Sequence, residues 1–523
     1  MKKLLLSIFT LLFPLFIFAQ ETAEQSIDDI INEKFGWLTG WFVEGIFYAI
    51  PIKEGVGIPW VVVYLLGFAT FFTIYFKFIN IGGFAKAINT VRGKYDDIDH
   101  HEVDPMYGDP TPGGDSIETI KVEGKEGEVS HFQALTAALS GTVGLGNIAG
   151  VAIAITIGGP GATFWMIVAG LLGMTSKFAE CTLGVKYRDV GEDGTVYGGP
   201  MYYLKKGLNE KGLGTLGKIL AALFAIFCIG GSFGGGNMFQ ANQAAQIFND
   251  VAGFSGGASG LIFGVIMAVF VGIVIIGGVK RIASVTEKVV PFMVGVYVLA
   301  ALVILGVNFT SIPDAFSKIF EGAFAPMGVV GGFFGVLVQG FRRAAFSNEA
   351  GVGSAAIAHS AVKTKYPASE GIVALLEPFI DTVVVCTITA LVIVITGNYV
   401  DVGGASGVQL TSNAFASVLP WFPYVLTVAV ILFAFSTMIS WSYYGLQSWL
   451  FLFGKTNRNV VTYKVLFCIF TIIGASISLG AVTDFSDAMI FAMAVPNLVG
   501  VSILLPRVRD ELAKYVSAIK ANK

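Results

Sequence analysis

The sequence predicts an all-α membrane protein in which most helices form two halves of opposite orientation. Three observations support this prediction: the composition, a series of long apolar segments, and the distribution of basic residues between the loops. Of 523 residues, 54% are hydrophobic and only 13% are charged, with a mean hydropathy of +0.74. Soluble domains carry about 25% charged residues, so lipid must solvate much of this surface. A net charge of −3 argues against a nucleic-acid partner.

The chain begins with a signal-like segment over residues 1–19. Two lysines precede an apolar run that ends at Ala19. The run is short for a membrane span and fits a secretory signal peptide. Ile17 stands where a cleavage site prefers a small residue, so an uncleaved anchor is the alternative. Residues 20–57 are polar and then aromatic, and Trp41 among them suits the membrane interface, so we expect an extracytoplasmic or interfacial segment.

Eleven apolar segments follow, each long enough to cross a hydrocarbon core of about 30 Å as a helix. The first, 58–78, is predicted to be an extra transmembrane helix. The other ten divide five and five, into a first repeat over 131–308 and a second over 326–505. The eleven predicted spans are 58–78, 131–157, 162–185, 218–245, 259–279, 288–308, 326–357, 370–397, 422–452, 463–480 and 486–505.

Lysine and arginine predict the orientation. If the mature N-terminus is outside, alternate loops face the cytoplasm, and these loops hold nearly all loop lysines and arginines. An odd number of spans then places the tail, 506–523, in the cytoplasm. Five spans per half is also odd, so the second half is inverted relative to the first, as is typical of alternating-access carriers. We therefore expect a multi-pass protein of the plasma (inner) membrane.

One long loop, 94–130, interrupts this pattern. It is acidic and rich in glycine and proline, with the stretch DPMYGDPTPGGD near its middle. This composition is typical of a flexible cytoplasmic insertion and not of a folded domain. A regulatory role is the alternative.

Glycine pairs interrupt the first span of each half, in GLGNIA at 144–149 and GVGSAA at 351–356. In lipid, an unwound turn leaves amide and carbonyl groups that something else must satisfy. The N-terminus of a half-helix can receive a carboxylate, and the freed carbonyls can hold a cation. Paired glycine breaks in corresponding places therefore indicate the substrate site of a secondary transporter. The alternative is that the glycines only allow close packing of helices.

The second interrupted segment also carries three charges, on Arg342, Arg343 and Glu349. Ionisable residues inside a membrane span are expensive and indicate a function by default. Two roles compete: either arginine pairs with Glu349 or Asp381 as a gate, or the charges are ties between helices near the cytoplasmic end. We do not expect these arginines to hold a substrate carboxylate, because backbone amides do so at a lower desolvation cost.

Two further stretches carry polar side chains inside apolar spans. One is rich in glycine and amides, and its Gln240 is suited to accept a hydrogen bond from an ammonium group. The other contains Ser436 and Thr437, whose hydroxyl oxygens suit a small hard cation, although hydroxyls often bond back to their own helix. Trp441 lies four residues after Thr437, on the same helix face, and can close an apolar lid.

Other function classes find less support. The four cysteines and four histidines are scattered without metal-ligand spacing, so we expect no cofactor and no metal beyond a transported ion. A membrane enzyme needs a nucleophile–base or metal constellation, and none is evident. An ion channel needs a continuous polar pore or rings of like charge, and neither is evident.

Five motifs in order complete the sequence evidence: SGTVGLGNIAGVA (140–152), GGPGATFWMIVAGLLG (158–173), GGPMYYL (198–204), FSNEAGVGSA (346–355) and STMISWSYYG (436–445). Together they resemble the sodium:alanine symporter family, also called alanine or glycine:cation symporters. The resemblance runs from about residue 58 to 505. Three features depart from the resemblance. Ile167 stands where the family usually has tryptophan, and the signal-like N-terminus and the 94–130 loop are further departures.

The resemblance implies a LeuT-type fold of five-plus-five inverted repeats with one extra N-terminal helix. It also implies sodium-coupled uptake of alanine or glycine, with sodium as a co-transported ligand and no obligate protein partner. The residues that would contact the amino acid are Thr142, Gly144, Asn147, Gln240, Phe346, Thr437 and Trp441. Sodium would lie between the carbonyls of Ser140 and Val143 and the hydroxyls of Ser436 and Thr437.

One alternative within this fold is a proton-coupled amino-acid carrier, because Glu349 and Asp381 can titrate. An ion channel is a more distant alternative.

Overall fold

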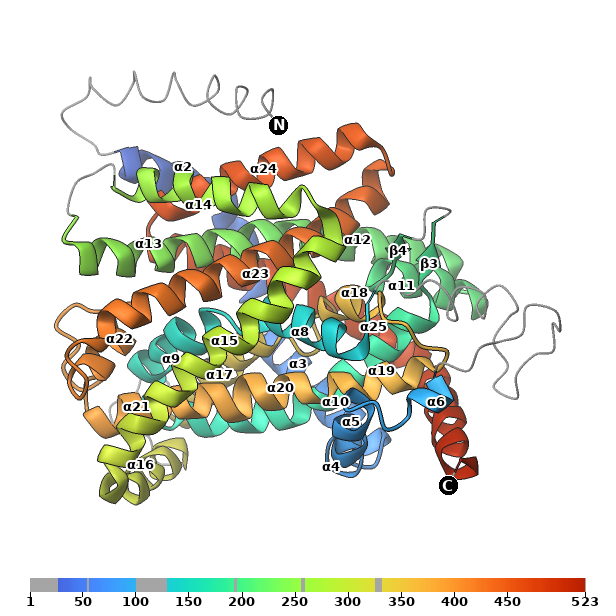
Figure 1. Ribbon diagram of the computed structural model, residues 1–523, viewed down its shortest axis with the longest axis horizontal. Helices are drawn as coiled ribbons and strands as arrows, with labels where there is room; N and C mark the ends of the chain where they lie inside the picture. The colour runs from blue at the N-terminus through green and yellow to red at the C-terminus, as the bar shows by residue number, and fades with distance from the viewer. Residues whose placement is uncertain are drawn as a thin grey trace.

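The computed structural model describes residues 27–53, 56–99, 129–191, 195–254, 259–324 and 332–522. The signal-like segment 1–19 and most of the 94–130 loop lie outside these ranges. Within them the chain is almost entirely helical (Figure 1). The strands form two small antiparallel hairpins, β1 (Ala49–Lys53) with β2 (Val56–Pro59) and β3 (Asp189–Val190) with β4 (Val196–Tyr197).

Every predicted span contains a helix or a broken helix. In the first half these are α3 (Trp60–Tyr75), α8 (His131–Thr142) with η1 (Gly146–Gly150) and α9 (Val151–Gly158), α10 (Ala162–Lys186), α12 (Gly214–Phe233) with η2 (Gly234–Met238) and α13 (Phe239–Ala252), α14 (Ser259–Ile275) and α15 (Gly278–Val307).

In the second half they are α17 (Gly332–Asn348) with α18 (Ala355–His359), then α19 (Pro367–Ala374), α20 (Leu376–Pro378), η4 (Phe379–Cys386) and α21 (Thr387–Thr396) in one span, α23 (Phe422–Phe453), α24 (Asn457–Ser476) and α25 (Leu479–Ala521). Among the described residues, seven helices are long and apolar enough to cross a membrane, or eight if the bent pair around 143–145 is one span. The protein is therefore a multi-pass, all-α membrane protein.

Further helices lie before the first span or between the spans, and the long apolar runs of the sequence do not reveal them. They are α2 (Ile27–Ile46), α4 (Ile79–Gly82), α5 (Phe84–Val91), α6 (Asp96–Asp99), α11 (Pro200–Glu210), η3 (Phe309–Ser311), α16 (Ile312–Phe324) and α22 (Val408–Ala416). Several are amphipathic: α16, for example, buries Ala315, Ile319 and Ala323 along one face. Such helices follow the 3.6-residue period and lack the uniform hydropathy of a span.

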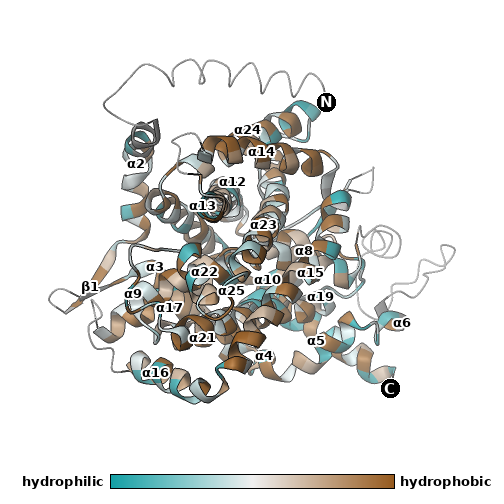
Figure 2. Cartoon of the chain, turned by 60° about the vertical axis from the view of Figure 1, so that its left-hand side comes forward, coloured by the Kyte–Doolittle hydropathy of each residue, from teal (hydrophilic) through white to brown (hydrophobic). Residues whose placement is uncertain are grey.

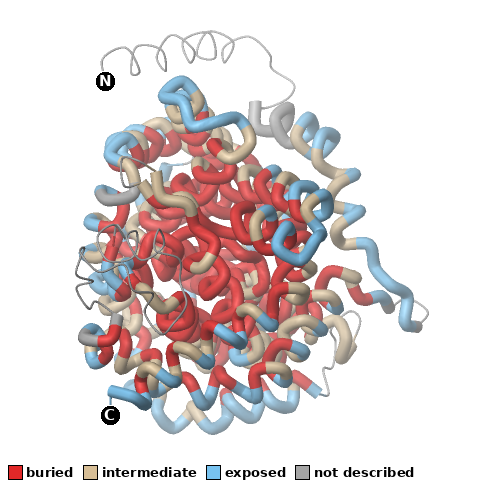
Figure 3. Tube along the Cα trace, turned by 90° about the vertical axis from the view of Figure 1, so that its right-hand side faces the viewer, coloured by how far each residue is buried: buried red, intermediate tan, exposed pale blue. Residues whose placement is uncertain are grey.

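The outer helices face lipid with apolar side chains. On α14, Ile262, Ile266, Phe270 and Ile273 are exposed and recur at helical spacing, so they form one stripe. Figure 2 shows α14 and α24 as mostly hydrophobic at the edge of the molecule. Figure 3 is coloured by burial and shows the buried residues concentrated in the centre of the molecule. Lipid replaces water around this stripe, which explains apolar exposure that a soluble protein would avoid.

Inside, α10 packs against α17 and α19, α12 packs against α25, and α14 packs against α24. Glycine also allows the chain at the start of α10 to approach α16 closely. Gly161, just before α10, lies against the backbone of Gly322 in α16. The Trp165 indole of α10 then donates a 3.2 Å hydrogen bond to the Ala323 carbonyl and fixes α16 on this helix.

We predict that Gly161→Ala destabilises the protein. The added methyl group would overlap the Gly322 backbone, which cannot rotate away, and overpacking of this kind costs about 1–3 kcal/mol. A lower melting temperature in detergent would show the effect. Gly67→Ala in α3 is the matched control, because a methyl group there meets no atom within 4 Å. Equal melting temperatures for the two variants would contradict the close approach of α10 and α16.

Candidate functional site

Both glycine-interrupted helices are discontinuous, as the sequence predicts. The first unwinds between Thr142 and Gly146, and its two halves are bent by 51°. The second ends at Asn348, and helix resumes only at Ala355. Gly351 and Gly353 have φ angles of 85° and 93° there, a conformation that residues with a Cβ rarely adopt.

At the first break, two side-chain amides satisfy the backbone groups that unwinding exposes. The Gly144 N–H donates to Asn147 Oδ1 at 2.9 Å, and the Leu145 N–H donates to Gln240 Oε1 at 3.2 Å. Gly144 has no room for a side chain, because a Cβ would collide with the Thr437 hydroxyl. The structure therefore brings four predicted site residues from η1, α13, α23 and the turn itself into one place.

A reciprocal pair of hydrogen bonds joins α8 to α23 beside this turn. The Thr437 hydroxyl donates to the Ser140 carbonyl at 3.0 Å, and the Ser140 hydroxyl donates to the Ser436 carbonyl at 2.8 Å. Val143, which is fully buried, has a non-helical ψ of 89° at the end of α8. The predicted sodium residues therefore lie side by side at the break.

Two of the predicted hydroxyls bond back to their own helices. Ser436 Oγ donates to the Phe433 carbonyl at 3.0 Å, and Thr142 Oγ1 donates to the Ala138 carbonyl at 3.3 Å. This is the arrangement that the sequence leaves open as the alternative for Ser436.

Trp441 and Phe346 form an aromatic wall beside the break. The Trp441 ring lies against Gly231 and Gly236, and Phe346 lies against Gly235 and meets the edge of Phe239 with ring centroids 5.0 Å apart. These glycines let two large rings sit against a helix backbone.

The wall is also fixed to the second break. Trp441 Nε1 donates to Glu349 Oε1 at 2.9 Å, and the other Glu349 oxygen accepts from Ser354. Glu349, with φ of 55°, thus orders the second turn and orients the tryptophan.

Asp381 lies at the centre of a cluster of polar side chains that the sequence does not reveal as a group. Its carboxylate accepts from Asn147 Nδ2 at 2.6 Å, from Ser347 Oγ at 2.9 Å and from Thr382 Oγ1 at 2.7 Å. The carboxylate is fully buried, and no Lys, Arg or His in the described parts of the chain forms an ion pair with it. A buried carboxylate without a positive partner is a strong candidate for holding a cation.

The predicted partners of the two arginines are wrong. Arg342 bonds Asp484 at 3.2 Å and Asp487 at 2.7 Å, and Arg343 bonds Asp487. Glu349 and Asp381 are occupied by the contacts described above. The arginines pair with acids at the start of α25. Glu349 instead lies at the second break, and Asp381 contacts Asn147 at the first break. The sequence does contain a signal for this pairing: Asp484 and Asp487 lie three residues apart at the start of the apolar helix α25.

Three π-helical turns, η1, η2 and η4, border this region. Such turns are rare and are often found at functional sites. The triple glycine Gly234–Gly236 permits η2, but hydropathy alone does not distinguish a π-turn from an α-helix. Within the described ranges, no group of three or more His, Cys, Asp and Glu side chains is arranged to hold a metal ion.

Two interrupted helices in corresponding places of the two halves, with amides, carbonyls and hydroxyls gathered at the first break, are typical of a secondary transporter. The chain belongs to the sodium:alanine symporter family, whose model matches residues 114–523. It is therefore a sodium-coupled amino-acid symporter and not an enzyme, and sodium is its co-transported ion. The resemblance seen in the sequence motifs is confirmed.

Several characterised or named proteins are similar to it. The sodium/alanine symporter AgcS of Methanococcus maripaludis is 39% identical over 89% of this chain and 96% of its own length. The probable sodium/glutamine symporter GlnT of Bacillus subtilis is 35% identical over 76% of this chain and 80% of its own. The crystal structure of MhsT in complex with L-phenylalanine matches with a TM-score of 0.54 over 75% of this chain and 93% of that one, at 18% identity. This last likeness shows a shared fold alone.

We predict that Asp487→Asn strongly destabilises the protein in detergent. The change leaves the buried Arg343 without its counter-charge, and breaking a buried ion pair costs about 3–5 kcal/mol. Thermal unfolding measures the loss. Asp484→Asn is the control, because that side chain is 58% exposed and its single contact is worth at most about 1 kcal/mol. If both variants unfold at the wild-type temperature, the pairing described here is not the one in solution.

Proposed function

We propose that this symporter takes up a small neutral amino acid, alanine or glycine, together with sodium by alternating access. The unwound turn at Gly144 is the observation that carries the proposal. Its two exposed amides are held only by the side chains of Asn147 and Gln240, beside the Thr437 hydroxyl. A substrate carboxylate is a stronger acceptor than either amide oxygen and can replace them.

The amino acid would then lie along the first break. Its carboxylate would meet the amides of the turn, with Thr142, Asn147, Gln240 and Thr437 around its polar groups. Its side chain would face Phe346 and Trp441, whose rings would limit its size. The name of AgcS refers to alanine and that of GlnT to glutamine, so the aromatic wall is the natural place for the family to set substrate size.

Two cation sites fit the geometry. The first is the predicted one, between the carbonyls of Ser140 and Val143 and the hydroxyls of Ser436 and Thr437. The second lies at Asp381, whose neighbours Ser347 and Thr382 would contribute hydroxyl oxygens. Oxygen ligands suit a hard cation such as sodium. Asn147 touches both the Gly144 turn and Asp381, so it would couple the cation at Asp381 to the bound amino acid.

The transport cycle fits a LeuT-type arrangement. Residues 131–308 and 326–505 would form the two inverted repeats, with 58–78 as the extra helix and eleven spans in all. Basic loops place the C-terminal tail, 506–523, in the cytoplasm and the mature N-terminus outside the plasma (inner) membrane. In this orientation Arg342 and Arg343 close the outer side through Asp487, in a gate that involves neither Glu349 nor Asp381.

We predict that a sodium gradient drives alanine uptake into proteoliposomes and that Asp381→Asn weakens the response to sodium. The variant keeps the size of the side chain and removes its charge, so the sodium concentration for half-maximal uptake should rise at least about tenfold, equivalent to about 1.4 kcal/mol. Asp314→Asn on the exposed α16 is the control and should behave as the wild type. Uptake that proceeds equally without sodium, or that follows a proton gradient instead, would reject sodium coupling.

We predict that Trp441→Ala widens the substrate range. Removal of the indole opens space against Gly231 and Gly236, so larger amino acids such as glutamine should compete with labelled alanine at lower concentrations than in the wild type. Trp441→Phe separates size from hydrogen bonding, because it keeps a ring and loses only the bond to Glu349. An unchanged order of competitors in Trp441→Ala would remove this residue from the substrate pocket.

A further inference from the structure

A second group of buried ionisable side chains lies around the start of α8 and the end of α18, and the proposed transport cycle does not use it. We call it the inner cluster: His131, Lys177, His359, Glu370 and Glu377. His131 contacts Glu370, His359 contacts Glu370 through one ring nitrogen and Glu377 through the other, and Lys177 Nζ bonds Glu377 at 3.0 Å. All five residues are buried. An unbroken chain of contacts thus joins four helical elements and α10.

The contacts of His359 require an additional proton. A neutral imidazole has one N–H donor and one acceptor, and an ionised carboxylate can only accept. Since each ring nitrogen of His359 faces a glutamate, either the ring is doubly protonated or one glutamate is protonated. In both cases His359, Glu370 and Glu377 together hold one proton more than they would with a neutral imidazole and two ionised carboxylates.

The charges lead to the same count. With the extra proton, the positive charges on Lys177 and His359 balance the negative charges on Glu370 and Glu377, with His131 neutral. Without it, the cluster carries an uncompensated negative charge away from water, which is strongly unfavourable. The other ionisable groups that face the cluster are Glu180, Cys181, Glu349, Asp381 and Tyr444. The carboxylates among them increase the need for the proton. The buried Arg188, which donates to the carbonyls of Ser360 and Val362 just after His359, is the basic group beside the cluster, and its charge is directed at these carbonyls.

The two histidines belong to the broken helices. His131 is the first residue of α8 and His359 is the last residue of α18. A short bridge between Val129 and Val362 ties these two ends together, with the Lys363 N–H donating to the Val129 carbonyl at 2.9 Å. The carboxylates belong to α19 and α20, and the lysine to α10. The inner cluster therefore fastens the pair of half-helices to the helices beside them.

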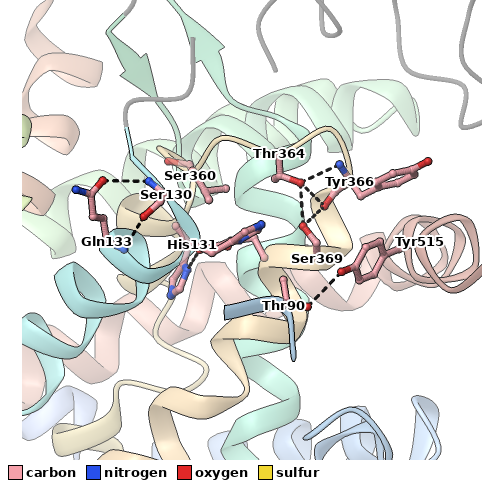
Figure 4. A network of polar contacts seen from close by, with 12 residues as sticks. Thr90, Ser130, His131, Gln133, Ser360, Thr364, Tyr366, Ser369 and Tyr515 are labelled. Atoms are coloured by element: carbon pink, nitrogen blue, oxygen red, sulfur yellow. Dashed lines mark hydrogen bonds and ion pairs between the residues drawn. The ribbon is translucent and has the colours of Figure 1, made fainter. Parts of the chain in front are cut away.

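Figure 4 shows the surroundings of His131 at this end of the molecule. Ser130 and Gln133 cap the start of α8 through reciprocal hydrogen bonds of 3.2 and 3.1 Å. The nearby loop is held by Thr364 and Ser369, whose hydroxyls lie 2.9 Å apart. Because the capping box fixes the first turn of α8, we expect the half-helix to move as a unit when His131 separates from Glu370.

We propose that the inner cluster is a proton-binding site whose proton keeps the inner face of the carrier closed and leaves to the cytoplasm when that face opens. The proposal rests on the alternating-access function above, since opening a path from the first break to this face requires the half-helices to part from α19 and α20. Water then reaches His359 and the proton departs. The proton returns when the face closes, so it is exchanged on one side and is not transported.

The decisive variant is Glu370→Gln. It removes one negative charge, so Lys177 and Glu377 balance each other and the extra proton is no longer needed. His359→Gln together with Glu370→Gln is a second charge-balanced variant, which keeps the test valid if the single variant folds poorly. Glu511→Gln is the control, because Glu511 bonds Lys186 at 2.6 Å near the end of α10, outside the cluster.

The full-length protein is reconstituted in vesicles with the C-terminal tail inside, and sodium-driven alanine uptake is measured at fixed external pH while luminal pH is stepped between about 6 and about 8. Wild-type uptake should rise with luminal pH, by up to about tenfold per unit for one linked proton. Glu370→Gln and the double variant should show a flat profile, and Glu511→Gln the wild-type profile. A flat wild-type profile, or a wild-type slope in Glu370→Gln, overturns the proposal.

A second measurement does not depend on transport. Hydrogen exchange of the amides at 131–137 is followed in substrate-free protein against pH, with the intrinsic pH dependence removed. Exchange should accelerate with pH in the wild type and not in Glu370→Gln. If no alanine uptake is found but this pattern appears, the transport proposal fails and the proton site stands. If uptake is normal and exchange does not respond to pH, the proton site fails alone.

Discussion

The structure depends on one constraint: a peptide group inside lipid must have a hydrogen-bond partner within the protein. At the first break that partner is a side chain, because Asn147 and Gln240 accept from the amides of Gly144 and Leu145. A helix interrupted in lipid survives only with such substitutes. The same requirement is the reason that we propose the turn as the substrate site, since a stronger acceptor that reaches these amides can take the place of the side chains.

Neighbouring elements are arranged around this turn. The reciprocal bonds of Ser140 with α23 hold the helix end in place, and Gly144 can approach Thr437 only because it has no side chain. Asn147 extends the arrangement to Asp381. Asn147 thus contacts the Gly144 amide through its oxygen and the buried Asp381 carboxylate through its nitrogen, so a ligand at either place would alter the hydrogen bonds of the other.

Much of this could be predicted from the sequence, and the reasons for the remainder are physical. Hydropathy located the spans, and the glycine pairs located both breaks, because each reflects a local cost in lipid. Pairing across the fold was not accessible in this way. One of the two competing hypotheses paired Arg342 or Arg343 with Glu349 or Asp381, yet the arginines bond Asp484 and Asp487 of α25 and so tie two helices together. Nothing in a single sequence gives the rotation of one helix relative to another.

The buried carboxylates show how the protein distributes charge through the membrane. Asp487 is balanced by a fixed arginine, which suits a contact that need only open and close. Glu377 is balanced by Lys177, and Glu370 meets only histidines, whose charge depends on a proton. Asp381 has hydrogen-bond donors but no basic partner among the described residues, and in the proposed function a transported cation supplies its counter-charge. The arginine at Asp487, the proton proposed for Glu370 and Glu377 and the transported ion proposed for Asp381 would be three solutions to one desolvation problem, and in the proposed cycle they correspond to a gate, a control point and a coupling site.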